Sequence, residues 1–310
     1  MTQALLSSFT SSELRKALKV GTFTLNLGPF SHLVSGYSEA LVEHLYHMYA
    51  DCHVELSPTD VTEVILNIRA PNVLRRFVRP QVTPDPGFQV PTVPLPRSMA
   101  ALAFEMGLNL SVALKCCRFV TVHAGVVADE RGAIIMSAES GGGKSTLTAA
   151  LMCQGYRLFS DEFALISLGD GTLNPYPRPI SLKQESIPIV REIAGADRIS
   201  KPLTGTPKGD IAYCSVKADD LRRESEPAQA RLLLFPKFAL GATAQARKLS
   251  PAEAVMRLIP ASTNYSLLGE PAFQALLSIV KRAPAYEITY GSTEHGLELV
   301  QELMALGEGA

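Results

Sequence analysis

The sequence predicts an α/β protein in two parts, with a small N-terminal module over residues 1–97 and a larger domain over residues 98–310. Three observations support this prediction. Segments with strand-type and helix-type patterning alternate along most of the 310 residues. A glycine loop joins an apolar segment at residues 133–137 to a helical pattern at residues 147–152. A stretch containing six prolines, residues 80–96, cannot form a helix, and we interpret it as the connection between the two parts rather than as a loop that wraps the surface.

The N-terminal part has the patterning of a small α/β module. Apolar residues recur at helical spacing over residues 11–19 and 38–49, and short strand patterns occupy residues 22–27, 54–56 and 64–68. The second helix and its exit carry a cluster of metal-type ligands: Glu43, His44, His47, Asp51, Cys52 and His53. His44 and His47 lie one turn apart and could share a metal ion, but the spacing fits no closed zinc site. We therefore interpret the cluster as a polar helix face followed by a polar turn.

A local basic group stands just before the proline-rich stretch. It consists of Arg75, Arg76 and Arg79. From the sequence we interpret it as a solvated surface rather than as a docking site for an acceptor.

The larger domain continues the alternation of helices and strands. A helix is expected over residues 98–114, and the sequence Ser250-Pro251-Ala252-Glu253 is a capping box that predicts a helix over residues 251–258. Further helices are expected at residues 271–281 and 293–306, and an Asp170-Gly171 pair indicates a hairpin. Strands are expected at residues 118–122, 126–127, 133–137, 163–168, 211–216, 232–235 and 286–290.

Composition excludes several classes of protein. A hydrophobic content of 46% supplies a sizeable core, and a net charge of −1 gives no overall attraction to nucleic acid or to an anionic membrane. No apolar run reaches the length of a membrane span. The five cysteines are odd in number and show no paired spacing, and residues 1–4 do not resemble the start of a signal peptide. The sequence therefore predicts a cytoplasmic protein with reduced cysteines.

The glycine loop has the composition of a phosphate-binding loop. A strand, the loop Ser140-Gly141-Gly142-Gly143, the pair Lys144-Ser145 with Thr146, and then a helix is the order that such a loop needs. Its glycines let successive N–H groups face phosphate oxygens, and the helix N-terminus adds partial positive charge. Lys144 can reach the β- and γ-phosphates of ATP, and the Ser145 hydroxyl can bind Mg²⁺. Ala138 stands where the usual pattern has glycine, and we expect it to strain the first turn slightly.

An acidic pair, Asp161-Glu162, follows the loop helix at the end of another short strand. One carboxylate there can hold Mg²⁺, and a second can accept the proton of an attacking hydroxyl. The alternative interpretation is a pair of acids that caps a turn.

Three segments together resemble the kinase domain of HPr kinase/phosphorylase, and more narrowly the bacterial HPr-kinase-related proteins. The segments are residues 123–127, which begin His123-Ala124-Gly125, the loop over residues 138–145, and residues 155–162, which end in Asp161-Glu162. The resemblance is specific over about residues 118–183 and does not extend to residues 1–97. It implies a P-loop kinase domain of the HPr kinase and phosphoenolpyruvate carboxykinase type, with a mixed sheet flanked by helices.

The resemblance also implies roles for individual residues. Asp161 matches the family's candidate base for an acceptor serine, and Lys144 and Ser145 match nucleotide and Mg²⁺ positions. His123 matches a histidine near the phosphates and is equally compatible with a structural histidine at the end of a strand. Glu162 stands where the family has an aspartate and is a candidate metal ligand. Arg178, Lys183 and Lys208 are candidates for neutralising phosphate charge, Lys208 from a lid, and each is equally compatible with an ordinary surface role. The sequence shows no clear match to the family motif associated with phosphorolysis, so the reverse reaction is not implied.

Three functions are compatible with these residues. The leading hypothesis is an ATP- and Mg²⁺-dependent kinase that phosphorylates a serine-type hydroxyl on a small protein or peptide. The second is a kinase acting on a sugar or another small metabolite. The third is a nucleotide-gated binding or assembly protein with little catalysis, which the departures at Ala138 and Glu162 would suit. No motif for nucleic-acid binding is present, and a homo-oligomer is expected by resemblance alone.

Overall fold

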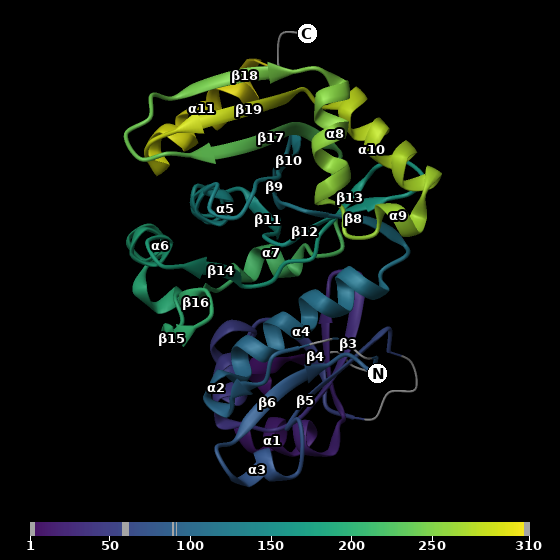
Figure 1. Cartoon of the computed structure of the whole chain (residues 1–310), viewed down its shortest axis with the longest axis vertical. Coiled ribbons are helices and arrows are strands. Elements are labelled where there is room, and N and C mark those ends of the chain that lie inside the picture. Colours follow the sequence, from purple (N-terminus) through teal and green to yellow (C-terminus); the bar gives the residue numbers. More distant parts are fainter. Residues whose placement is uncertain (1–3, 58–61, 89, 91, 307–310) are drawn as a thin grey trace. The chain divides into compact units, whose positions relative to one another are not determined.

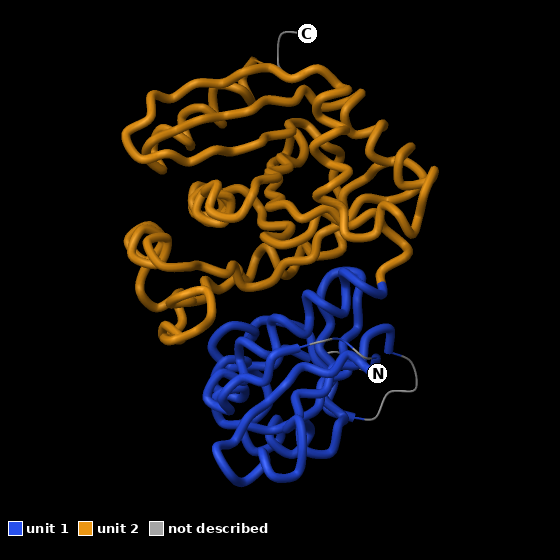
Figure 2. Tube along the Cα trace, viewed as in Figure 1, with its two compact units in different colours: residues 1–115 blue, residues 116–310 orange. Residues whose placement is uncertain are grey.

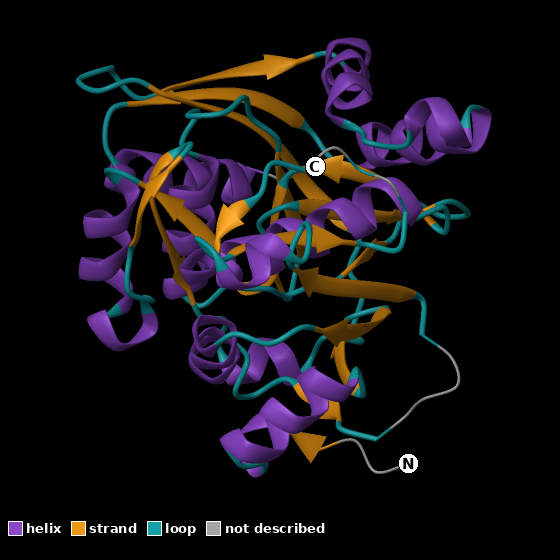
Figure 3. Cartoon of the chain, turned by 60° about the horizontal axis from the view of Figure 1, so that its bottom comes forward, coloured by secondary structure: helices purple, strands orange, loops and turns teal. Residues whose placement is uncertain are grey.

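The computed structural model describes residues 4–57, 62–88, 90 and 92–306, and these form two compact units, residues 1–115 and 116–310 (Figure 2). Residues 1–3, which belong to the segment that does not resemble a signal peptide, and Pro91 of the proline-rich stretch lie outside the described residues. In both units helices pack beside strands, as the alternating sequence pattern predicts (Figure 3). None of the helices in the described ranges is long and apolar enough to cross a membrane.

Unit 1 contains a mixed sheet with the strand order β1-β4-β2-β3-β5-β6-β7, in which β3 and β5 are parallel (Figure 1). Its strands are β1 (Ala4–Leu5), β2 (Phe23–Leu27), β3 (Phe30–Ser35), β4 (His53–Glu55), β5 (Val64–Arg69), β6 (Gln81–Asp85) and β7 (Leu95–Pro96). Its helices are η1 (Leu6–Ser8), α1 (Ser11–Val20), α2 (Glu39–Met48), α3 (Leu74–Phe77), η2 (Arg97–Met99) and α4 (Ala100–Lys115).

The boundary between the units lies 18 residues later than the predicted boundary at residue 97, because α4 belongs to unit 1. Ten residues of α4 are buried, and the helix packs on β5 and β6. The contact is close at Gly107, where a Cβ atom would lie 2.4 Å from Leu66 Cδ1. The proline-rich stretch is therefore internal to unit 1: part of it forms β6 and β7, which hydrogen-bond in the sheet, and it does not connect two domains.

Unit 2 is built on a mixed six-stranded sheet with the order β11-β9-β10-β17-β19-β18, accompanied by two three-stranded antiparallel sheets, β13-β12-β8 and β14-β16-β15. Its strands are β8 (Phe119–His123), β9 (Gly125–Asp129), β10 (Gly132–Met136), β11 (Arg157–Ser160), β12 (Phe163–Ser167), β13 (Leu173–Asn174), β14 (Ile180–Lys183), β15 (Leu203–Thr206), β16 (Gly209–Cys214), β17 (Ala230–Phe238), β18 (Gln245–Leu249) and β19 (Ala285–Tyr290). Its helices are α5 (Lys144–Cys153), α6 (Ser186–Ala194), η3 (Ala196–Arg198), α7 (Ala218–Arg222), α8 (Pro251–Ala261), α9 (Tyr265–Leu268), α10 (Glu270–Arg282) and α11 (Thr293–Leu306).

The two faces of the six-stranded sheet carry different helices. Val126, Ile135 and Leu233 face a core that also contains buried residues of α8 and α10. Alternate residues of the same strands point to the other face, and on that side α5 packs on β9 and against α11. The central strands β10, β17 and β19 run parallel, so their carboxyl ends meet at one edge, where the glycine loop begins (Figure 1).

Several elements were not predicted from the sequence. They include β3, α6 and the edge strand β18, of which four of five residues are exposed. A strand that is polar on its exposed positions lacks the alternation by which strands are recognised, and only its pairing with β19 defines it. By contrast, the capping box forms as predicted, with Ser250 Oγ accepting from the Glu253 N–H at 3.2 Å and the Glu253 carboxylate accepting from the Ser250 N–H at 2.8 Å.

Candidate functional site

The glycine loop lies between the end of β10 and the start of α5, as the sequence predicts. Gly141 and Gly143 adopt φ angles of +88° and +86°, which side chains other than glycine rarely accept. Gly143 is the N-cap of α5, so the first N–H groups of that helix lie immediately after the loop. Ala138 is not among the described residues with positive φ, so alanine fits there without the backbone strain expected from the sequence.

The loop packs tightly against the ends of the neighbouring parallel strands. The Phe238 N–H donates to the Gly142 carbonyl oxygen at 3.2 Å, and a Cβ atom on Gly142 would lie 3.0 Å from the Pro236 carbonyl oxygen. A Cβ atom on Gly143 would lie 2.6 Å from the Tyr290 hydroxyl. Gly143 is therefore required both by its backbone conformation and by its close contact with Tyr290, whereas Gly142 is favoured by close contacts alone. The carboxyl ends of β17 and β19 support the loop.

A third close contact, between β9 and α5, fixes the position of Lys144, the first residue of α5. Gly125 at the start of β9 faces this helix, and a Cβ atom there would lie 2.3 Å from Thr148 Oγ1 and 3.4 Å from Lys144 Cγ. The glycine of the His123-Ala124-Gly125 segment thus lets α5 pack directly on β9. Ser145 and Thr146 follow in the first turn of the helix and remain partly accessible.

Lys144 and Asp161 form a buried ion pair. Lys144 Nζ lies 3.1 Å from Asp161 Oδ1 and also donates to the Asp161 carbonyl oxygen, and the two side chains are 8% and 2% exposed. The other carboxylate oxygen, Asp161 Oδ2, is buried and makes no hydrogen bond to the described residues. Burial raises the pKa of the Asp161 carboxyl above its usual value, and the Lys144 charge and the Ser145 hydroxyl oppose that rise.

Strand pairing brings His123 next to the acidic pair. Residues 161 and 162 lie between β11 and β12, and β12 pairs antiparallel with β8 so that His123 lies opposite Phe163. His123 Nδ1 lies 3.1 Å from the Glu162 carbonyl oxygen and 3.6 Å from Glu162 Oε2. The His123 side chain is 46% exposed, and its partial desolvation, followed by the positive charge of Lys144, lowers its pKa, so the ring is neutral near pH 7. A neutral ring that bonds the carbonyl donates from Nδ1 and leaves Nε2 unprotonated.

The structure also positions the remaining predicted residues. Arg178 is buried at 5% exposure, two residues after Tyr176, whose N–H donates to the Phe159 carbonyl oxygen at 2.7 Å. This backbone hydrogen bond holds the segment that contains Arg178 beside β11, the strand that leads to Asp161. Lys208 instead lies in the exposed turn between β15 and β16, and none of the described contacts joins it to the glycine loop. Lys183 ends β14 and is exposed.

Sequence reasoning did not identify Tyr290 as part of this site. Tyr290 ends β19 and is only 2% exposed, and its hydroxyl has no hydrogen-bond partner among the described residues. Its ring packs against α11 at Gly296, where a Cβ atom would lie 3.1 Å from the ring, and edge-on to Phe238. Burial raises the pKa of Tyr290, so the hydroxyl stays protonated. The sequence does not mark Tyr290 as a site residue, because a tyrosine in an alternating strand pattern looks the same as any aromatic residue of the core.

Replacing Tyr290 with phenylalanine should stabilise the free protein. A buried hydroxyl without a partner costs about 1–3 kcal/mol, so the Tyr290→Phe variant should raise the free energy of unfolding by about 1 kcal/mol. Urea unfolding of both proteins without ligand measures this difference. A loss of 1 kcal/mol or more would show that the hydroxyl is bonded in the native protein.

The candidate metal cluster of unit 1 does not form. His44 is buried and its Nε2 lies 2.8 Å from Glu105 Oε1, to which the Tyr49 hydroxyl also donates at 2.6 Å. His44 therefore belongs to a buried polar network between α2 and α4. The described residues contain no group of three or more His, Cys, Asp or Glu side chains able to hold a metal ion.

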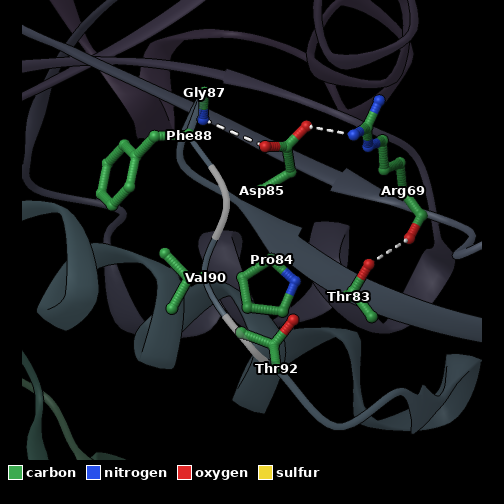
Figure 4. Close-up of a pocket in the computed structure, with 8 residues that line it drawn as sticks. All are labelled: Arg69, Thr83, Pro84, Asp85, Gly87, Phe88, Val90 and Thr92. Atoms are coloured by element: carbon green, nitrogen blue, oxygen red, sulfur yellow. Dashed lines mark hydrogen bonds and ion pairs between the residues drawn. The ribbon is translucent and has the colours of Figure 1, made fainter.

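Unit 1 contains an open pocket of about 750 Å³ at the ends of β5 and β6 (Figure 4). Arg69 and Asp85 form an ion pair of 2.8 Å at its rim, and the pocket is completed by Thr83, Pro84, Gly87, Phe88, Val90 and Thr92. None of the residues predicted for the phosphate site lines this pocket.

Comparisons with solved structures relate this chain to known proteins by its backbone. No protein-family model matches the sequence, and no curated protein matches it. The structure of the Hpr(Ser) kinase/phosphatase from Coxiella burnetii is similar to 61% of this chain and 95% of that chain, at 12% sequence identity and a TM-score of 0.28. The chain is thus a mixed α/β protein with a distant structural resemblance to an HPr kinase/phosphatase.

Proposed function

We propose that unit 2 is an ATP-dependent kinase that transfers the γ-phosphate to a serine-type hydroxyl on a small protein or peptide. The observation that carries this proposal is the buried pair of Lys144 and Asp161 at the start of α5, immediately behind the glycine loop. A buried lysine–aspartate pair could have a purely structural role at any helix. This pair, however, places a cation and a base beside a helix N-terminus that is suited to phosphate.

In the free protein Lys144 bonds Asp161, and a bound triphosphate offers Lys144 a stronger anionic partner. When the Lys144 ammonium group moves to the β- and γ-phosphates, it stabilises the charge that develops on the γ-phosphoryl group during its transfer. The same movement releases Asp161, whose carboxylate then accepts the proton of the acceptor hydroxyl. The raised pKa of Asp161 in its buried setting makes the carboxylate a stronger base for that step.

The residues beside the loop fit Mg²⁺, which would supply charge neutralisation on the phosphates. This ion binds oxygen ligands, usually one or two from the protein and the rest from phosphate and water. The Ser145 hydroxyl lies at the start of α5 and would supply one of these oxygens, and the Glu162 carboxylate would supply the other. Glu162 is the second carboxylate of the pair and lies beside His123. His123, neutral and with Nε2 unprotonated, can hold a hydrogen-bond donor of the acceptor or of a bound water.

The acceptor class is part of the proposal and rests on the sequence resemblance of the three motifs to HPr kinases. A metabolite kinase would use the same Lys144 and Asp161, and a nucleotide-gated binding protein would use the loop without transfer. The three functions therefore differ in the product and not in the phosphate site.

The test is a transfer assay with the full chain, Mg²⁺ and γ-labelled ATP. Serine-containing peptides, their alanine-substituted counterparts, and a set of sugars and polyols are offered as acceptors. Label should move to the serine peptides, and mass spectrometry should place one phosphate on the hydroxyl. Transfer to the sugars alone would replace the peptide acceptor with a metabolite. Tight ATP binding without transfer to any acceptor would refute the kinase proposal.

A further inference from the structure

A protruding apolar and basic segment of unit 1 is not used by the proposed kinase site. It consists of residues 73–79 and includes the single helical turn α3 (Leu74–Phe77), which follows β5 (Figure 1). Val73, Leu74 and Phe77 have spacings of one and three residues and share one side of this turn, because Val73 also has helical backbone angles. Asn72 Oδ1 accepts a hydrogen bond from the Arg75 N–H at 2.9 Å and holds the start of the turn.

The apolar side chains of this segment are exposed to an unusual degree. Val73 is 79% exposed, Leu74 64%, Phe77 73% and Val78 52%. Side chains that line a groove are shielded by its walls, and these four project outward instead. Four large apolar residues clustered at such exposure mark a surface that is covered by a partner in use.

The charged residues of the segment have one sign. Between Val64 and Pro84 the sequence contains four arginines and no aspartate or glutamate, and among the described residues only Arg69, which lies outside the segment, is paired with an acid, Asp85. Three of these arginines, Arg75, Arg76 and Arg79, lie within the segment itself. A partner that covers it therefore has to be anionic as well as able to take up protruding apolar side chains.

We propose that residues 73–79 form a docking surface for an anionic lipid bilayer. A bilayer surrounds side chains that project, whereas a peptide lying along a surface needs a groove, and these residues do not form one. Arginines next to apolar and aromatic side chains match the arrangement in which lipid headgroups meet acyl chains. This docking is independent of the phosphate site in unit 2, and it is reversible because the inserted apolar surface is small.

Cosedimentation of the full chain with lipid vesicles tests the proposal. The vesicles are pure phosphatidylcholine, or phosphatidylcholine mixed with about one third phosphatidylserine, which brings the anionic surface potential that attracts arginine. The wild-type protein should sediment with the anionic vesicles and not with the neutral ones. The bound fraction should fall as salt is raised, because salt screens exposed charges.

Two sets of variants separate the apolar and the charged contributions. The Leu74→Ser/Phe77→Ser and Arg75→Gln/Arg76→Gln double variants should each lower the bound fraction at least fivefold. The control Val20→Ser removes an apolar side chain that is 67% exposed elsewhere in unit 1, and it should leave binding unchanged. All these positions are solvent-accessible, so the variants should keep the circular dichroism spectrum of the wild type.

Three results would overturn the proposal. One is equal binding to neutral and anionic vesicles, and another is no binding to either. The third is a change in the sedimentation mass of the Leu74→Ser/Phe77→Ser variant without a change in lipid binding, which would make the surface an interface between copies of the chain.

Discussion

The Asp161→Asn variant is expected to lose phosphoryl transfer by a factor of about 10³, because a positioned general base contributes roughly 10²–10⁴ in rate. Asparagine preserves the shape of the side chain but cannot accept the proton of the acceptor hydroxyl. Lys144 also donates to the backbone carbonyl oxygen of Asp161, which the substitution keeps, and the circular dichroism spectrum checks that the variant is folded. Initial rates of labelled phosphate transfer under saturating ATP measure the effect.

Two controls sharpen this prediction. Nucleotide affinity, measured by calorimetry with ADP, should change by less than about fivefold, because Lys144 and the loop remain. The Asp170→Asn variant removes an exposed carboxylate in the turn after β12 and should transfer phosphate at the wild-type rate. A fast Asp161→Asn enzyme would show that another group accepts the proton, and Glu162→Gln is then the variant to measure.

The Lys144→Met variant is expected to lose both nucleotide affinity and transfer. Methionine keeps the unbranched, apolar stem that packs near Gly125 but removes the charge that meets the phosphates. Loss of one preorganised charge contact typically lowers kcat by about 10²–10³, and the affinity for ATP should fall at least tenfold in parallel. Calorimetry with ATP and transfer kinetics measure the two losses separately.

Two further lysine variants give the comparison. Lys248→Met changes an exposed lysine of β18 and should behave as wild type. Lys208→Met tests the sequence-based assignment of the β15–β16 turn to phosphate binding: unchanged kinetics would place Lys208 on the ordinary surface. If Lys144→Met binds and transfers as well as wild type, the glycine loop does not bind the phosphates of ATP.

Local sequence signals predicted the elements that depend on local chemistry. The capping box at Ser250 and the turn at Asp170-Gly171 form where they were expected, because caps and tight turns are determined by a few adjacent residues. The extent of α4 was also close to its predicted range. Its membership of unit 1 was not predictable, because periodicity shows that a helix has an apolar face and not which sheet that face covers.

The arginine group in unit 1 illustrates the same limit at the surface. A net charge of −1 for the whole chain gave no reason to expect an anionic partner. The segment became informative only when the structure showed that Val73, Leu74, Phe77 and Val78 project from it. Exposure of an apolar residue is a property of the packing around it, and an apolar residue in a sequence is expected to be buried.

What the sequence alone determined is a glycine loop with a lysine, followed by an acidic pair. It predicts phosphate binding from them, because glycine, lysine and carboxylate have chemical roles that spacing makes visible. Only the tertiary structure decided that Lys144 and Asp161 form an ion pair, and that the Tyr290 hydroxyl lies in close contact with Gly143. These contacts join residues 17 and 147 positions apart, through the packing of α5 on β9 and the parallel pairing of β10, β17 and β19. Contacts across that distance follow from strand order and close packing, which no local pattern records.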